Sequence, residues 1–214
     1  MGRGFFIVLE GIDGSGKTTQ AWLLAEALRL KGYEVVLTRE PSDGPLGRWL
    51  RRYLAASPRR LSPELELAWF LADRCEHVAN LIRPALEQGK IVISDRYYYS
   101  SAAYQGARGL DPEAIIVLNE AFAPRPDLVF LLELPVAEAL RRRQQSAGVR
   151  QLSEAREYLE RVQACYERFQ GPHLVRLNAA LPLQVLHCHV MSLSLTALER
   201  AGVSPVAGTW EESP

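Results

Sequence analysis

The sequence predicts an α/β domain with a doubly wound, five-stranded parallel sheet and helices on both of its faces. Two observations support this prediction. Short apolar runs that have the composition of buried strands alternate along the chain with segments of helical periodicity, which is the pattern of consecutive βαβ units. The length of 214 residues suits one such domain with small insertions.

Each element follows from its own pattern. The expected strands are Phe5–Glu10, Glu34–Thr38, Ile91–Ser94, Leu128–Leu134 and Leu174–Leu177. The expected helices are Thr18–Leu30, Ser62–Glu87, Asp111–Ala123, Pro135–Gln145, Ser153–Phe169 and Pro182–Arg200. These elements make one domain over residues 1–200, and residues 201–214, rich in Gly, Pro, Ser and Glu, are expected to form a mobile tail.

The predicted helix Ser62–Glu87 is apolar over a wide arc, because it carries two apolar stripes. One stripe is expected to contact the sheet, and the other to contact a second subunit or line a pocket. The helix starts with Ser-Pro-Glu, a typical N-cap with proline at the first helical position.

Composition excludes several classes of function. The formal net charge is zero, so charge gives no reason to expect nucleic-acid binding. No segment approaches 18 uninterrupted apolar residues, so we expect no membrane partner. The three cysteines are widely spaced and form no disulfide framework, which favours the reducing cytoplasm.

The segment Gly11–Thr18 fits the phosphate-binding pattern G-x-x-x-x-G-K-[ST] and lies between a predicted strand and a predicted helix. Glycines let successive backbone N–H groups point at an anion, and the start of the helix adds partial positive charge. Lys17 is expected to reach the β- and γ-phosphates, and Thr18 to bind Mg²⁺. The residues expected to bind ATP are Gly11, Ile12, Asp13, Gly14, Ser15, Gly16, Lys17, Thr18 and Thr19.

The phosphate loop does not identify the phosphoryl acceptor, because GTPases, ATPase motors and small-molecule kinases share it. The guanine-reading motif N-K-x-D is absent from the sequence. A kinase is therefore the leading class.

Three further clusters indicate an anionic acceptor. Residues Thr38–Pro41 follow the second predicted strand, at the strand end where ligands bind in parallel sheets. Phe70 and Arg74 share one helix face and suit a nucleobase reader; the alternative is a core phenylalanine and a surface ion pair. Asp95 ends an apolar strand, as in a Walker-B arrangement that supports Mg²⁺, and Arg96 suits an acceptor phosphate; the alternative is a strand-end ion pair.

Taken together, these segments resemble the thymidylate kinase family. The loop followed by Thr-Gln, the T-R-E-P quartet, F-x-x-x-R on the long helix and D-R-Y-x-x-S-S-x-A-Y-Q-G occur in the order and spacing of that family, from about Phe5 to about Arg200. The resemblance implies a P-loop NTPase-type fold with a short arginine-rich lid. It also implies a homodimer that phosphorylates dTMP to dTDP with ATP and Mg²⁺ in dTTP biosynthesis.

The resemblance implies a role for each matching residue. Asp13 corresponds to a loop carboxylate that contacts the 3′-hydroxyl of the acceptor and helps position Mg²⁺. Arg39, Arg51 and Arg96 correspond to arginines around the acceptor 5′-phosphate. The nucleoside is expected to contact Phe70 by stacking, Arg74 at the carbonyl edge, Ser101 and Gln105 near N3, and Tyr104 near the sugar 2′ position.

The expected lid spans about residues 141–153 and contains Arg141–Arg143 and Arg150. Some family members carry an arginine in the phosphate loop at the position of Gly14, so here the lid arginines are the candidates to stabilise the transferring phosphoryl group. The expected catalytic residues are Asp13, Lys17, Arg96, Arg141 and Arg150. The chain departs from the family pattern at Ser42–Asp43, where two glycines are usual, and at Val149, where an aspartate is usual.

Two alternatives to dTMP phosphorylation stay open at this point. One is a kinase for another monophosphate or for a deoxynucleoside. The other is a P-loop protein that binds nucleotide as a sensor without turnover.

Overall fold

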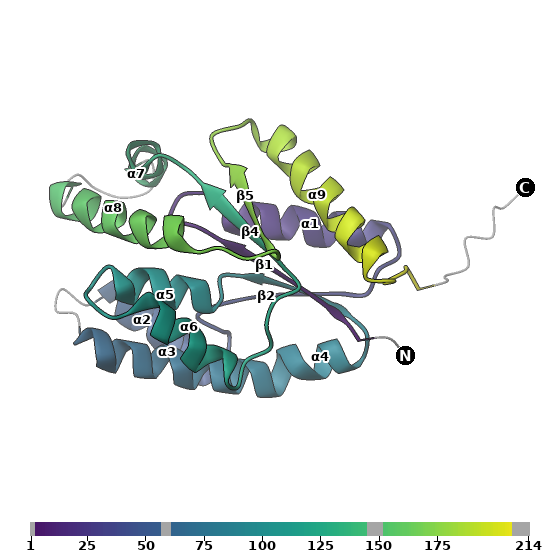
Figure 1. Ribbon diagram of the computed structural model, residues 1–214, viewed down its shortest axis with the longest axis horizontal. Coiled ribbons are helices and arrows are strands. Elements are labelled where there is room, and N and C mark those ends of the chain that lie inside the picture. The colour runs from purple at the N-terminus through teal and green to yellow at the C-terminus, as the bar shows by residue number, and fades with distance from the viewer. Residues whose placement is uncertain (1–2, 57–60, 145–151, 207–214) are drawn as a thin grey trace, which may run out of the picture.

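The computed structural model describes residues 3–56, 61–144 and 152–206, which form a three-layer α/β fold (Figure 1). The strands are β1 (Phe5–Glu10), β2 (Val35–Arg39), β3 (Ile91–Asp95), β4 (Leu128–Glu133) and β5 (Leu174–Asn178). The helices are α1 (Lys17–Leu30), α2 (Pro45–Ala56), α3 (Pro63–His77), α4 (Arg83–Glu87), α5 (Tyr98–Gly106), α6 (Pro112–Glu120), α7 (Val136–Gln144), α8 (Leu152–Arg168) and α9 (Leu183–Arg200), with a π-helical turn η1 (Val78–Ile82) between α3 and α4.

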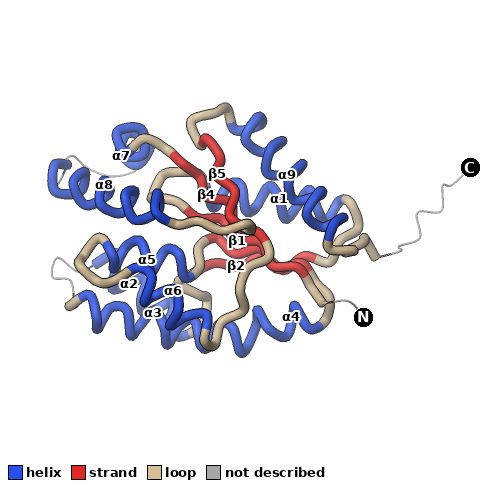
Figure 2. Tube along the Cα trace, in the orientation of Figure 1, coloured by secondary structure: helices blue, strands red, loops and turns tan. Residues whose placement is uncertain are grey.

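The five strands form one parallel sheet in the order β2-β3-β1-β4-β5. Helices α1 and α9 pack together over one face, while α3 to α6 and α8 lie over the other (Figures 1 and 2). The predicted doubly wound fold with a five-stranded sheet is therefore confirmed. Because both faces are covered, every residue of β1 is buried, which explains its continuous apolar run.

The strand register brings the sequence motifs to one edge of the sheet. Leu9 of β1 lies opposite Asp95 of β3, and Asp95 lies opposite Arg39 of β2. The phosphate loop after β1, the Thr38–Pro41 segment and the Asp95-Arg96 pair therefore leave the sheet side by side at their carboxyl ends.

The long predicted helix Ser62–Glu87 is interrupted, because η1 separates α3 from α4. Its predicted N-cap is confirmed: Ser62 Oγ accepts a hydrogen bond from Leu65 N at 3.3 Å, and Pro63 opens α3. Two further helices, α2 and α5, were not expected from the sequence pattern. α2 contains Gly47, where an added Cβ would lie 2.1 Å from the carbonyl oxygen of Ser42, so the close approach of these two segments requires glycine.

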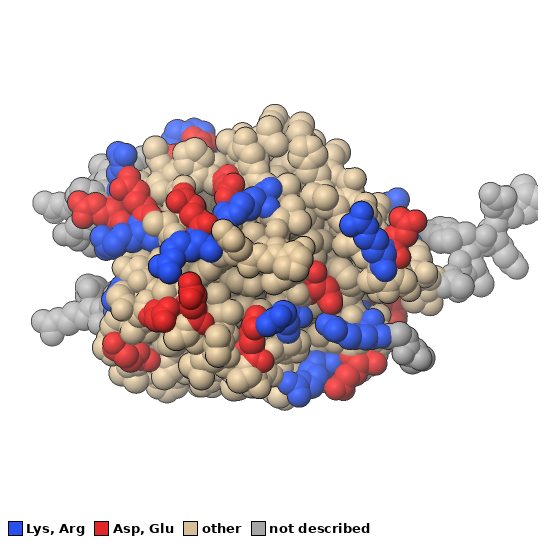
Figure 3. Space-filling view, in the orientation of Figure 1, with Lys and Arg blue, Asp and Glu red and all other residues tan. Residues whose placement is uncertain are grey.

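The polypeptide after α9 returns to the end of α1. Val206 N donates a hydrogen bond to the carbonyl oxygen of Gly32 at 3.0 Å. The remaining residues of the predicted tail, 207–214, lie outside the described residues. Within the described ranges, no helix is both long and apolar enough to cross a membrane. Acidic and basic side chains are mixed over the face shown in Figure 3.

Candidate active site

The phosphate loop lies at the centre of the sheet edge, between β1 and α1. Gly14 and Gly16 have positive φ angles of 91° and 92°, a conformation that side chains with a Cβ rarely adopt. An added Cβ on Gly14 would lie 2.7 Å from the carbonyl oxygen of Ala139 on α7. The arrangement thus leaves no room for an arginine at Gly14, because α7, which precedes the expected lid, packs directly on the loop.

Lys17 is buried and folds back along the loop. Its Nζ donates hydrogen bonds to the carbonyl oxygen of Ile12 at 2.8 Å and to Ser15 Oγ at 3.4 Å. Burial, together with the nearby charge of Arg96, lowers the pKa of Lys17 to about 8. A bound phosphate would supply the negative charge that favours the protonated amine.

Thr18 and Asp95, the two expected Mg²⁺ ligands, are in contact, since Thr18 Oγ1 donates a hydrogen bond to Asp95 Oδ2. The other carboxylate oxygen, Asp95 Oδ1, is buried and has no hydrogen-bond partner in the described part of the chain. Hydroxyl and carboxylate oxygens are the donors that Mg²⁺ prefers, and a buried oxygen without a donor suits a cation. The described residues contain no cluster of three or more His, Cys, Asp or Glu, so any Mg²⁺ here would depend on nucleotide phosphates and water for its other ligands.

Asp13, Arg96 and Tyr104 meet between the loop and β3. Arg96 Nη2 donates a hydrogen bond to Asp13 Oδ1, Arg96 lies over the Tyr104 ring at 5.3 Å, and Tyr104 Oη accepts a hydrogen bond from Asp13 N at 3.1 Å. Arg96 has a positive φ of 73°, which is uncommon for a residue with a side chain. Such strain concentrates at functional sites, where the surroundings hold it in place.

A cavity of about 340 Å³ opens beside this group, between α3, α5 and α8. It is called the acceptor cavity below. The expected acceptor-binding residues that line it are Asp13, Phe70, Arg74, Arg96, Ser101, Tyr104 and Gln105. Its wall also contains residues to which the sequence analysis assigned no individual role. Glu40, Pro41, Tyr97 and Ser100 belong to the motifs described above, whereas Leu54, Tyr158 and Leu159 lie outside them.

Arg74 is buried in the cavity wall, contrary to the alternative of a surface ion pair, with its side chain 1% exposed. Its guanidinium donates hydrogen bonds to Glu40 Oε2 from Nε and Nη2, to Asn119 Oδ1 at 2.6 Å and to Ser101 Oγ at 3.1 Å. Burial by itself raises the pKa of Glu40, but the charge of Arg74 and a hydrogen bond with His77 outweigh this and leave that pKa lowered.

Arg39 and Arg51 do not line the acceptor cavity. Both pair with Asp43, Arg39 through Nη2 at 2.8 Å and Arg51 through Nη2 at 2.7 Å. Asp43 is the residue that stands where the family pattern has a glycine. Its loop is fixed from α3, because Asp73 accepts hydrogen bonds from Ser42 N at 2.8 Å and Ser42 Oγ at 2.5 Å.

The expected lid lies largely outside the described residues, and this includes Arg150. Arg141 is described and pairs with Glu138, from Nε to Oε2 at 2.7 Å. Arg142 pairs with the other oxygen of Glu138 at 3.0 Å and donates a hydrogen bond to the carbonyl oxygen of Ala179 at 3.2 Å. These hydrogen bonds from Arg141 and Arg142 lower the pKa of Glu138 to about 2.

Glu10 is a buried residue that supports the site and that the sequence analysis missed. At the end of β1 its Oε1 accepts hydrogen bonds from Tyr97 N at 2.8 Å and Ser100 N at 3.1 Å, while its Oε2 accepts one from Ser100 Oγ at 2.6 Å. Ser100 Oγ in turn accepts a hydrogen bond from Arg96 at 3.0 Å. Glu10 therefore fixes the start of α5. The only sign of this in the sequence is an acidic residue at the last position of an apolar strand.

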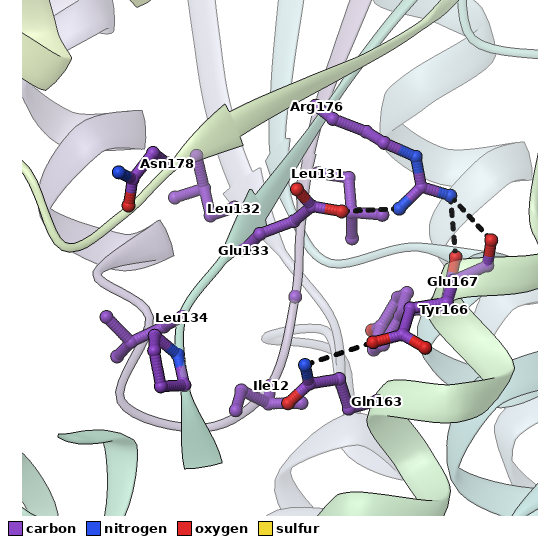
Figure 4. A pocket seen from close by; sticks show the side chains of 12 residues that line it. Ile12, Leu131, Leu132, Glu133, Leu134, Gln163, Tyr166, Glu167, Arg176 and Asn178 are labelled. Atoms are coloured by element: carbon purple, nitrogen blue, oxygen red, sulfur yellow. Dashed lines mark hydrogen bonds and ion pairs between the residues drawn. The ribbon is translucent and has the colours of Figure 1, made fainter. Parts of the chain in front are cut away.

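A second cavity, of about 380 Å³, lies between α8 and the ends of β4 and β5 (Figure 4). Arg176 in its wall donates hydrogen bonds to Glu133 at 2.6 Å and to carbonyl oxygens at the end of α8, including that of Phe169 at 2.8 Å. Tyr166 Oη donates a hydrogen bond to Glu10 Oε2 at 2.9 Å. These contacts hold α8 against the sheet and keep Glu10 in place.

A phosphate loop at the centre of a parallel sheet, next to an arginine-lined cavity, is the arrangement of a P-loop nucleotide kinase. The sequence model of the family described as thymidylate kinase matches residues 9–190 of the chain. The chain therefore belongs to the thymidylate kinase family, which phosphorylates dTMP to dTDP with ATP, and the predicted resemblance is confirmed.

Individual relatives agree with this assignment. The chain is 48% identical over 197 residues to a probable thymidylate kinase of Pyrococcus horikoshii, covering 89% of this chain and 96% of the relative. It is 46% identical to a probable thymidylate kinase of Thermococcus kodakarensis, covering 90% and 98%. It is 45% identical to a thymidylate kinase of Desulfotalea psychrophila, covering 82% and 87%.

Proposed function

We propose that the chain carries out the reaction of its family at the junction of the phosphate loop and the acceptor cavity. Transfer of the ATP γ-phosphoryl group to the 5′-phosphate of dTMP requires two anions to approach each other. The acceptor phosphate is already ionised, so positioning and charge stabilisation carry the catalysis. The observation that supports this most is a single cavity lined by Phe70, Arg74 and Gln105 that opens onto Asp13 and Arg96 at the loop.

The phosphate groups are assigned to the loop and its neighbours. Loop N–H groups and Lys17 hold the donor phosphates, and Arg96 orients the acceptor phosphate toward them. Thr18 and Asp95 would hold Mg²⁺, which would neutralise phosphate charge. Arg39 and Arg51 approach the acceptor phosphate once they leave Asp43.

The nucleoside of dTMP is assigned to the cavity. Phe70 stacks on the base, Arg74 donates to a carbonyl oxygen, and Ser101 and Gln105 contact the N3 edge. Tyr104 occupies the space beside the sugar 2′ carbon, where a ribose hydroxyl would need room. Asp13 accepts from the 3′-hydroxyl after its contact with Arg96 rearranges.

An assay with ATP, Mg²⁺ and a panel of monophosphates tests the proposal. Release of ADP and formation of dTDP with dTMP, in preference to dCMP, dGMP and AMP, is the expected result. Stimulation by another acceptor alone, or nucleotide binding without turnover, would contradict it. Lys17→Ala is expected to remove turnover. Lys31→Ala, which changes an exposed lysine directly after the other end of α1, is the matched control.

We further propose that the working form is a homodimer assembled through α3 and α6. Leu65 on α3 and Leu118 on α6 are each 48% exposed, and the shallow groove between these helices is lined mainly by apolar side chains. Ala68 and Cys75 on α3 and Ala79 in η1 are also exposed, and such small residues allow close helix contact. Light scattering should give twice the chain mass, and Ala68→Arg should give monomers. The cytoplasm is the compartment we propose, since all three cysteines are unpaired.

A further inference from the structure

Gln105 on α5 is buried in the wall of the acceptor cavity, and the two ends of its amide have different surroundings. Its Nε2 donates a hydrogen bond to Glu66 Oε2 at 3.0 Å. Its Oε1 is buried and has no hydrogen-bond partner within the described residues. Because a buried acceptor without a donor is costly, Oε1 is suited to accept from a ligand.

The amide orientation of Gln105 follows from the chemistry of Glu66. Glu66 lies on α3 with its side chain fully buried, and Arg108 Nη1 pairs with its Oε2 at 2.5 Å. A carboxylate only accepts hydrogen bonds, so the NH₂ group of the Gln105 amide must face Glu66. The amide oxygen is thereby left as the group that meets a ligand.

Arg74 provides the opposite polarity in the same cavity. Its described hydrogen bonds use four of the five guanidinium N–H donors and leave one on Nη1. A donor beside an acceptor complements a thymine or uracil base, which presents a carbonyl oxygen next to an N–H. Cytosine presents an amino group next to a bare ring nitrogen. Its amino group would face the Arg74 donor and its ring nitrogen would face the Gln105 acceptor, so neither hydrogen bond would form.

We propose that Glu66 is a positioning residue that determines base specificity by fixing Gln105 as a hydrogen-bond acceptor. Glu66 is not among the described residues that line the cavity, and it acts through Gln105. This inference rests on the proposed function, because it takes the base of the acceptor nucleotide to lie against Gln105. It adds a residue that lies outside every motif of the sequence analysis.

Glu66→Met tests the proposal, because methionine fills similar space and accepts no strong hydrogen bond. The amide of Gln105 is then free to turn, so we expect kcat/KM for dTMP to fall about 10-fold or more, mainly through KM. The ratio of kcat/KM for dTMP to that for dCMP should fall by a similar factor. Glu66→Gln keeps an acceptor oxygen and is expected to retain a ratio close to that of the unmodified chain.

The ion pair with Arg108 needs its own control. The double variant Glu66→Met/Arg108→Met removes both charges of this ion pair and is expected to fold even if the single variant does not. It should show the same loss of selectivity. Arg108→Met alone keeps the carboxylate and should keep the ratio.

Dissociation constants for dTMP and dCMP, measured by calorimetry without ATP, give a second readout that does not depend on turnover. An unchanged ratio in the double variant, or an equal loss for both nucleotides, would overturn the role of Glu66. Failure of the unmodified chain to phosphorylate dTMP in the same assay would instead overturn the proposed function.

Discussion

Glu40, directly after β2, accepts two hydrogen bonds from the guanidinium of Arg74, and both side chains are almost completely buried. Paired hydrogen bonds of this kind fix the plane of a guanidinium. His77 Nδ1 lies 3.2 Å from the second oxygen of Glu40, so the carboxylate is held from α3 at two points. Arg74, the arginine proposed to contact the base, is therefore held in place by the protein itself.

Glu40→Gln is expected to destabilise the protein at pH 7 by about 3–5 kcal/mol, because it leaves Arg74 without its counter-charge. The pKa of Glu40 is lowered in the folded state, so its stabilising effect is complete above the ordinary pKa of 4.5 and disappears as the pH falls through the folded-state value. Chemical denaturation should show a stability gap between the two proteins that narrows below about pH 4.5. A constant gap down to the lowest pH at which both stay folded would contradict this.

The phosphate loop was predictable from the sequence because its chemistry is local. Eight consecutive residues provide the backbone donors, the lysine and the hydroxyl, and the strand and helix on either side confirm their context. The surroundings of Arg74 were not predictable in the same way. Its partners Glu40 and Asn119 lie 34 and 45 residues away on other elements, and only the fold brings them together.

Helices α2 and α5 were not predicted, for a related reason. Gly47 within α2 and the serines of α5 are poor helix formers, and packing outweighs their low propensity. Seven of the nine residues that the family resemblance implies for dTMP binding line the acceptor cavity, and their roles stay predictions. The resemblance did not indicate that Asp43 would pair with two of the expected phosphate-binding arginines.

Asp43→Asn is expected to lower KM for dTMP by about 2- to 5-fold at low salt. In this variant, Arg39 and Arg51 no longer have to give up ion pairs with Asp43 in order to bind the acceptor phosphate. The expected gain is small, because an exposed ion pair contributes about 1 kcal/mol or less. High salt should abolish the difference, because the charges are exposed. Glu113→Gln removes an equally exposed carboxylate far from the loop and is the control. A higher KM in Asp43→Asn would show that Asp43 positions the arginines instead.

Gly14→Ala is expected to destabilise the protein and slow turnover. Alanine at a φ of 91° is strained, and its Cβ would also lie 2.7 Å from the Ala139 carbonyl oxygen. Gly109→Ala is the matched control, since Gly109 has a φ of 105° and open space around its Cβ position. Conformational strain alone costs roughly 1–2 kcal/mol in each variant. Thermal and chemical unfolding give the loss of stability in each variant. The additional loss in Gly14→Ala measures the contact with α7, and equal losses in the two variants would argue against that contact.

Tyr97→Phe is expected to leave stability unchanged or raise it by up to about 1 kcal/mol. The Tyr97 hydroxyl is buried with no hydrogen-bond partner in the described part of the chain, so its removal avoids the cost of burying a polar group. The ring itself matters, because it lies 5.3 Å from the Arg74 guanidinium and packs edge-on against Phe6. Tyr97→Ala should cost about 3–5 kcal/mol through the cavity it creates. A loss of more than 1 kcal/mol in Tyr97→Phe would indicate a bound water on the hydroxyl.

Arg150→Ala is expected to lower kcat more than it raises KM, because the proposed role of the lid arginine is to meet charge on the phosphoryl group in transfer. The close contact of Gly14 with α7 strengthens this expectation, because it leaves no space for an arginine at this position of the phosphate loop. Arginines in that role contribute up to about 10³- to 10⁵-fold in rate in other phosphoryl transfers. Arg156→Ala is the control for the loss of an arginine near the expected lid, because Arg156 is exposed and pairs with Glu160 on α8. Steady-state kinetics with dTMP varied at saturating ATP separates the two parameters, and a change confined to KM would refute the role.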